Sequence, residues 1–88
     1  MPEYNIRFAR SARKELEHLD ASVVSRIFPK IEALAHDPRP PGCRKLQGLE
    51  NLWRIRVGSY RVVYQALDDK QVVDIVAVRH RSQAYRLG

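Results

Sequence analysis

The 88-residue chain is poor in the residues that build several common kinds of site. Its one cysteine, Cys43, excludes an internal disulfide framework and predicts a reducing, cytoplasmic location. No run of ~18 apolar residues is present, and the first residues lack an apolar run of signal-peptide length. The four glycines form neither a phosphate-binding loop nor a serine-elbow motif. The sequence therefore excludes disulfide-rich, membrane-spanning and P-loop proteins.

Metal-ligand patterns are also missing. The three histidines, His18, His36 and His80, lie far apart without the spacing of a metal site, and Cys43 has no companion. No metal and no other cofactor is therefore expected.

Length and composition predict one small globular domain over residues 1–88. A hydrophobic fraction of 44% with 30% charged residues is too apolar for a disordered tail. The chain has no room for two domains, a dinucleotide-binding fold or a barrel of eight β/α units. A domain of this size buries only about 60% of its unfolded surface, so we expect marginal stability without a partner.

Positive charge is concentrated in the C-terminal part. Sixteen basic residues against ten acidic ones leave a net charge of +6. Residues 37–88 hold ten of the basic residues and five of the acidic ones, a net of +5. Twelve of the sixteen are arginine, whose planar fork binds phosphate at two points. This balance indicates a nucleic-acid partner, although a basic surface that only aids solubility gives the same count.

The first half of the chain predicts a strand and a helical hairpin. Residues 4–9 alternate apolar and polar side chains, as a short strand does. Ser11 is expected to cap a first helix, and Asp20 a second one. Pro29 falls inside the second helix and is expected to kink or shorten it. The inner faces of the two helices are formed by Ala12, Leu16 and Leu19, and by Val23, Ile27, Ile31 and Leu34.

The second half predicts three strands. Proline-rich residues 37–42 end the second helix. Strands 53–57 and 60–66 flank a two-residue turn, and strand 72–78 follows a further turn. The fold class is therefore α+β in the order β-α-α-β-β-β, with the helical hairpin packed on one face of a small, mostly antiparallel sheet.

The turn at Gly58 and Ser59 predicts the register of its two strands and places Arg56 opposite Arg61. One sheet face then collects Trp53, Ile55, Val57, Tyr60, Val62 and Tyr64, which suits packing against the helices. The other face collects Arg54, Arg56, Arg61 and Gln65. Like charges directly opposite each other destabilise a hairpin. No acidic residue on these two strands offsets the repulsion between Arg56 and Arg61, unless Asp74 on the next strand reaches across. A site for a polyanion is favoured over solvated arginines on an open sheet face.

The tail at 79–86 adds three arginines, His80 and Tyr85. Histidine titrates near neutrality, and tyrosine stacks on a base or donates a hydrogen bond. A lone histidine beside arginine is more often a surface residue than a catalyst. The nearness of this tail to the arginines of the sheet favours a functional role for His80.

Residues 45–49, 53–64 and 79–85 together resemble a RelE-type toxin of the RelE/ParE superfamily, the toxic half of a type II toxin–antitoxin pair. The resemblance covers nearly the whole chain. The middle stretch is widespread in the superfamily, whereas the Arg-His-Arg…Tyr ending points to its RNA-cleaving branch. The resemblance implies ribosome-dependent cleavage of mRNA without metal. In that reaction the ribose 2′-hydroxyl attacks the adjacent phosphate, giving a 2′,3′-cyclic phosphate and a 5′-hydroxyl.

The resemblance also implies which residues carry the chemistry. Catalytic roles fall to Arg54 and Arg56 on the base and phosphate side, Arg61 on the scissile phosphate, Arg79 near the leaving oxygen and Tyr85 on the reacting nucleotide. His80 and Arg81 are further catalytic candidates. Arginine holds its proton more firmly than lysine and is a poorer general base, so either charge stabilisation dominates or His80 is the acid or base. RNA contacts are expected from Arg44, Lys45 and Arg86.

Two other functions stay open at this point. A ParE-like inhibitor of DNA gyrase keeps the fold and explains the charge without Tyr85. A catalytically inactive member would act only as the partner of an antitoxin. The expected partners are a RelB-like antitoxin, the ribosome and mRNA, and no membrane. Codon preference, the mode of antitoxin docking and the residue that moves the proton are not determined by the sequence.

Overall fold

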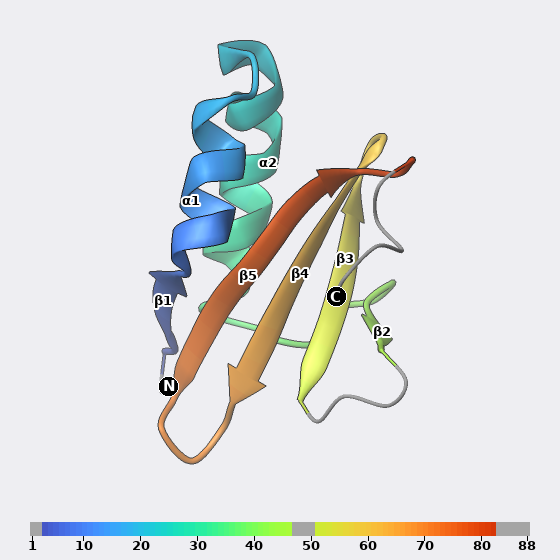
Figure 1. Cartoon of the computed structure of the whole chain (residues 1–88). Helices are drawn as coiled ribbons and strands as arrows, with labels where there is room; N and C mark the ends of the chain where they lie inside the picture. Colours follow the sequence, from blue (N-terminus) through green and yellow to red (C-terminus); the bar gives the residue numbers. More distant parts are fainter. Residues whose placement is uncertain (1–2, 47–50, 83–88) are drawn as a thin grey trace.

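A computed structural model describes residues 3–46 and 51–82 (Figure 1). Two helices follow the first strand, and four further strands follow the helices. In chain order the elements are β1 (Asn5–Phe8), α1 (Arg10–Glu17), α2 (Ala21–Ala33), β2 (Arg44–Lys45), β3 (Leu52–Val57), β4 (Tyr60–Leu67) and β5 (Val72–His80).

All five strands form one sheet in the order β1-β5-β4-β3-β2. β1 runs parallel to β5, and every other neighbouring pair is antiparallel. Figure 1 shows α1 and α2 side by side against the sheet. The predicted α+β class and helical hairpin are confirmed, and the two-residue strand β2 is an addition that the sequence pattern did not predict.

The β3–β4 hairpin has the predicted register. Val57 pairs with Tyr60 and Arg56 with Arg61 around the Gly58–Ser59 turn. Gly58 has a φ of 60°, which a residue without Cβ adopts at no steric cost. The two-residue turn therefore sets which side chains share a face along the whole hairpin.

Strand β5 is longer than predicted and irregular. It extends to His80 instead of ending at Val78. Val63 pairs with Ala77 whereas Tyr64 pairs with Ile75, so one extra residue lies on β5 between these pairs. Such a bulge shifts the register of the following pairs by one residue.

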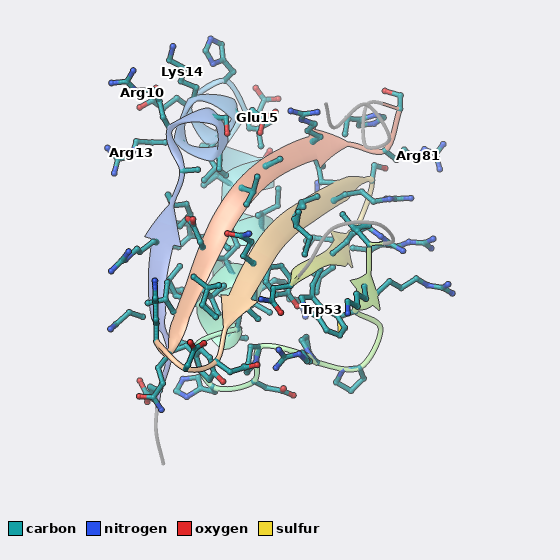
Figure 2. All side chains as sticks on the ribbon, turned by 60° about the horizontal axis from the view of Figure 1, so that its bottom comes forward. Arg10, Arg13, Lys14, Glu15, Trp53 and Arg81 are labelled. Carbon is teal, nitrogen blue, oxygen red and sulfur yellow. The ribbon has the colours of Figure 1, made fainter. Side chains whose placement is uncertain are left out.

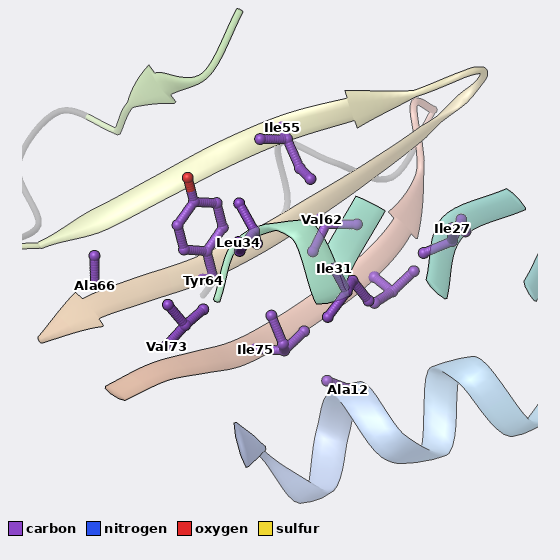
Figure 3. Close-up of a cluster of buried hydrophobic side chains, with 11 residues drawn as sticks. Ala12, Ile27, Ile31, Leu34, Ile55, Val62, Tyr64, Ala66, Val73 and Ile75 are labelled. Carbon is purple, nitrogen blue, oxygen red and sulfur yellow. The ribbon is translucent and has the colours of Figure 1, made fainter. Parts of the chain in front are cut away.

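The hydrophobic core lies between the helices and one face of the sheet (Figure 3). The predicted inner residues of α2, Ile27, Ile31 and Leu34, are buried against Val62 and other residues of β3, β4 and β5. From β4, Tyr64 is also fully buried, and its hydroxyl donates a hydrogen bond to the carbonyl of Pro38. Burial raises the pKa of Tyr64 above its usual range. The opposite sheet face carries Arg54, Arg56, Arg61 and Gln65 together with the buried Val63 and Ala77.

The helix starts differ from the predicted caps. Helix α1 begins at Arg10 with Ala9 at the N-cap, so Ser11 lies inside the helix. The Ser11 hydroxyl instead donates to the carbonyl of Val76 on β5 at 2.8 Å. Asp20 does occupy the N-cap of α2, but its side chain makes no capping hydrogen bond. Ser11 is thus used to join α1 to the sheet edge.

Helix α2 continues through Pro29. The missing N–H costs one backbone hydrogen bond, and the ring lies on an exposed position of the helix. Ile27 and Ile31 on either side are buried in the core, which holds both segments against the sheet. The predicted shortening of the helix is not observed.

The loop after α2 is tied to the β4–β5 turn. Arg39 donates two hydrogen bonds to the carboxylate of Asp68, at 3.0 and 2.7 Å, and its guanidinium lies 5.0 Å from the ring centre of Trp53. Tyr4 donates to the same carboxylate at 2.7 Å. The hydrogen bonds from Arg39 and then from Tyr4 lower the pKa of Asp68.

Neither helix in the described ranges is long and apolar enough to cross a bilayer.

Candidate functional site: an arginine row across three strands

Three arginines lie side by side across the middle of the sheet. Arg56 of β3 is paired with Arg61 of β4, and Arg61 is paired on its other side with Arg79 of β5. Residues directly opposite in antiparallel strands point to the same face. This arginine row, Arg56–Arg61–Arg79, therefore lies on the sheet face opposite the helices. The predicted facing of Arg56 and Arg61 is confirmed.

Two more arginines continue this face. Arg54 lies two residues before Arg56 on β3 and faces Val63, and Arg44 of β2 faces Arg54. Lys45 is paired with Trp53, so the register assigns it to the helix side. The structure thus groups Arg44 and Arg54 with the arginine row but separates Lys45 from it.

Arg61 is the centre of the row and is buried. It is 8% exposed and is the only charged residue within the described ranges that is buried. Its Nε has no hydrogen-bond partner among residues 3–46 and 51–82. An unpaired buried donor on a charged group costs free energy that a bound acceptor would recover. The site is therefore suited to an anion that accepts hydrogen bonds, such as a phosphate.

Arg79 has an acidic partner on helix α1. Its Nε donates to Oε2 of Glu15 at 2.8 Å, and Oε1 of Glu15 accepts from the backbone N–H of Val78 at 2.9 Å. Figure 2 labels Glu15 on α1. Asp74, which the sequence left open as a possible partner of the arginines, instead faces Gln65 farther along β4. The carboxylate of Glu15 on helix α1 therefore contacts the row.

Glu15 was missed as a site residue by sequence reasoning. It lies three residues after Ala12 and four before Leu19, which places it on the same side of α1 as the apolar stripe. An acidic side chain on the inward side of an amphipathic helix is a signal that would have indicated a basic partner in the sheet.

His80 lies on the other side of the sheet from the arginine row. It follows Arg79 directly, and alternation along β5 places its ring on the helix side, at the same level as Tyr60. The two rings meet edge to face with their centres 5.4 Å apart. His80 also lines a cavity of about 320 Å³ with Lys14 and Glu15. The structure therefore places the His80 ring on the other sheet face from Arg56 and Arg61.

The remaining candidates lie at or beyond the end of β5. Arg81 is exposed in the turn after this strand, where its backbone N–H donates to the carbonyl of Ser59 at 2.7 Å (Figure 2). Tyr85 and Arg86 lie outside the described residues. The expected roles of these residues stay predictions.

An open depression borders the row where β3 extends beyond its pairing with β2. Its volume is about 610 Å³, and it is lined by Pro41, Gly42, Cys43, Arg44, Ile55 and Arg56. Two of these residues carry guanidinium groups. Within residues 3–46 and 51–82, no three histidine, cysteine, aspartate or glutamate side chains gather as a metal site would require.

A family model described as the ParE toxin of the type II toxin–antitoxin system parDE matches residues 6–85 of this sequence. The chain belongs to the RelE/ParE toxin family. The mRNA interferase toxin RelE of Escherichia coli strain K12 is 34% identical over 86 residues, which cover 93% of this chain and 90% of that protein. The predicted resemblance is confirmed, and the chain is a RelE-like toxin of a type II toxin–antitoxin system.

Solved RelE structures share its order of helices and strands. The intact Escherichia coli RelBE toxin–antitoxin complex contains a chain with a TM-score of 0.78 and 32% identity, covering 88% of this chain and 95% of its own length. An archaeal RelE–RelB complex from Pyrococcus horikoshii OT3 matches with a TM-score of 0.80 and 26% identity, covering 94% and 99%.

Proposed function

We propose that this RelE-like toxin is a ribosome-dependent mRNA endoribonuclease that acts in the cytoplasm and inhibits translation. The observation that carries the proposal is the buried Arg61, set between Arg56 and Arg79 with an unpaired Nε in the described part of the chain. A relative with 34% identity is named an mRNA interferase, which supports RNA as the substrate.

The proposed reaction needs no cofactor from the protein. The ribose 2′-oxygen forms a bond to the adjacent phosphorus, while the bond from phosphorus to the 5′-oxygen breaks. The 2′-hydroxyl loses a proton, the 5′-oxygen gains one, and negative charge builds up on the phosphate between these events. Guanidinium groups already held in place are suited to stabilise that charge.

Arginines act in this scheme by charge and hydrogen bonding. A guanidinium group has no acceptor site and keeps its proton at neutral pH, so these arginines are poor proton acceptors. The row, with Arg54 beside it, is proposed to hold the scissile phosphate. Tyr85 is proposed to position the reacting nucleotide, and Arg81 is an alternative to Arg79 at the leaving oxygen. Message contacts are assigned to Arg44, Lys45 and Arg86. His80 receives no role in proton transfer, because strand alternation directs its ring to the sheet face opposite that of Arg56 and Arg61.

Cleavage of a message on purified ribosomes tests the proposal. We expect codon-positioned cuts, mapped by primer extension, with upstream fragments that end in a 2′,3′-cyclic phosphate. Arg61→Ala and Tyr85→Ala should each slow cleavage by about 100-fold or more, since losing one transition-state donor typically costs that much. Arg13→Ala is the matched control, because Arg13 points away from the sheet on α1 (Figure 2). Unchanged cleavage by Arg61→Ala would contradict the proposal.

An antitoxin is the proposed protein partner. Two of the solved relatives are toxin chains in complex with an antitoxin, and the exposed positive charge favours an acidic or amphipathic segment that orders on binding. The test is to search the adjacent reading frame for a short chain with a DNA-binding end and to co-express that chain with this one. We expect a stable complex and restored growth, and absence of both would argue against the pairing.

Inhibition of DNA gyrase is the second candidate, because the matching family model is described as a ParE toxin. It predicts SOS induction with intact messages in arrested cells, whereas the endoribonuclease predicts cut messages. Expression without any growth arrest would favour a catalytically inactive member.

A further inference from the structure

Glu15 and Arg79 form a partly buried ion pair at the end of the arginine row. The Glu15 side chain is 27% exposed and that of Arg79 is 25% exposed. One carboxylate oxygen accepts from Arg79 Nε and the other from the backbone N–H of Val78. Both oxygens of the carboxylate are therefore engaged by the same strand.

The position of Glu15 follows from the edge of the sheet. β1 pairs with β5 only from Val72 to Ile75, so the backbone of β5 beyond Ile75 would lack a partner on that side. Helix α1 follows β1 and covers this edge, where Ser11 donates to the Val76 carbonyl and Glu15 accepts from the Val78 N–H. An uncovered strand edge leaves backbone groups unpaired, which proteins avoid. The carboxylate is thus held at a fixed place beside Arg79.

A fixed carboxylate restrains the whole guanidinium of Arg79. That group is planar and carries five N–H donors in fixed directions. When Nε is bound to Glu15, the plane of the group is constrained, and so are the directions of the other donors. Because Arg79 also faces Arg61 directly, the same carboxylate offsets the repulsion between the two cations.

We propose that Glu15 is a positioning residue that orients Arg79 for cleavage. This inference rests on the proposed endoribonuclease function. A carboxylate that only cancelled positive charge would weaken RNA binding, and its removal would then speed cleavage or tighten binding. A positioning residue has the opposite effect, because its removal lowers the rate of the bound complex.

Glu15→Gln is a close test, because it keeps the shape and the carbonyl oxygen that can accept from Val78. Its NH₂ group cannot accept a hydrogen bond from Arg79 Nε. Glu17→Gln is the matched control, since Glu17 is exposed on the same helix and the variant changes the net charge equally. Single-turnover cleavage on ribosomes, measured against toxin concentration, separates the maximal rate from the half-saturating concentration.

We expect Glu15→Gln to lower the maximal rate by about tenfold or more, with little change in the half-saturating concentration. Glu17→Gln should match the wild type. The double variant Glu15→Gln, Arg79→Ala should have the same maximal rate as Arg79→Ala alone, because Glu15 acts through Arg79. A wild-type rate for Glu15→Gln, a faster rate, or a fully additive loss in the double variant would overturn the proposal.

A second measurement on the wild-type protein needs neither a variant nor cleavage. The Arg79 Nε–H should be visible by NMR and exchange with water far more slowly than that of exposed Arg13. Equal exchange rates would overturn the positioning role. If the wild-type protein failed to cleave messages on ribosomes, the proposed function would fall, while the exchange rates would still decide whether Glu15 holds Arg79.

Discussion

Reversing the charge of Arg56 is expected to stabilise the fold while it removes the proposed activity. Arg56 is exposed and directly faces Arg61, which is buried. Cross-strand pairs of opposite charge contribute roughly 0.2–1 kcal/mol, and like pairs are destabilising. Arg56→Glu turns repulsion into attraction, so the free energy of unfolding should rise by about 1 kcal/mol after allowance for solvent screening. For a domain of this size that corresponds to a rise in Tm of about 4–8 °C.

Urea denaturation of the free protein measures this change. The order of stability at low salt should be Arg56→Glu above Arg56→Gln above wild type, because glutamine removes the repulsion without adding an attraction. Raising the salt from 0.1 M to 1 M shortens the screening length from about 10 Å to about 3 Å, so the difference between the three proteins should shrink. Growth arrest on expression should be lost in Arg56→Glu.

Lys70→Glu is the control for net charge. Lys70 is exposed in the turn between β4 and β5, outside the paired strand residues, so its reversal should give no comparable stabilisation. A wild-type midpoint for Arg56→Glu, or a gain equal to that of Lys70→Glu, would refute the electrostatic account of the arginine row.

Other predictions concern the supports of the fold and His80. Asp68 has a lowered pKa because it is bound to Arg39, so its stabilisation is present above the unfolded pKa of about 3.9 and is lost as the pH falls through the folded value. Asp68→Asn should remove this loss of stability at acidic pH, which amounts to about 1 kcal/mol or less for this exposed ion pair. Urea denaturation at several pH values measures the difference. Tyr64→Phe should lower the free energy of unfolding by about 1–2 kcal/mol, because the Pro38 carbonyl loses its donor. In the wild-type protein, burial raises the pKa of Tyr64, so stability should begin to fall above a pH of about 10. His80→Gln should leave the maximal rate of ribosomal cleavage within about twofold of wild type, and a loss comparable to that of Arg61→Ala would return His80 to the chemistry.

Local signals were enough to predict the hairpin that carries most of the site. The Gly58–Ser59 turn permits one register, and the strict alternation on either side then assigns every side chain to a face. The facing of Arg56 and Arg61 follows from these two features alone. The same reasoning assigned Ile55 and Val62 to the core, where they are buried.

Features that depend on distant parts of the chain were not predictable in this way. The bulge between Val63 and Tyr64 shifts the pairing of β5, and no local pattern in that strand marks it. The extension of β5 to His80 places Arg79 opposite Arg61 and turns the His80 ring to the other face. The contact of Glu15 with Arg79 joins residues 64 positions apart, so it exists only once α1 has packed against β5.

The two ends of the arginine-bearing face use different arrangements of charge. At the end nearer the β4–β5 turn, Asp74 lies between Arg7 of β1 and the neutral Gln65 of β4, so positive and neutral groups surround one acid. At the other end, the three strands place arginine beside arginine, and the central Arg61 is buried. The first arrangement is enough to keep the protein soluble, and it creates less electrostatic repulsion than the second. The repulsion in the second is offset when a polyanion lies across the row, and a message bound as proposed would supply that charge at the residues that act on it.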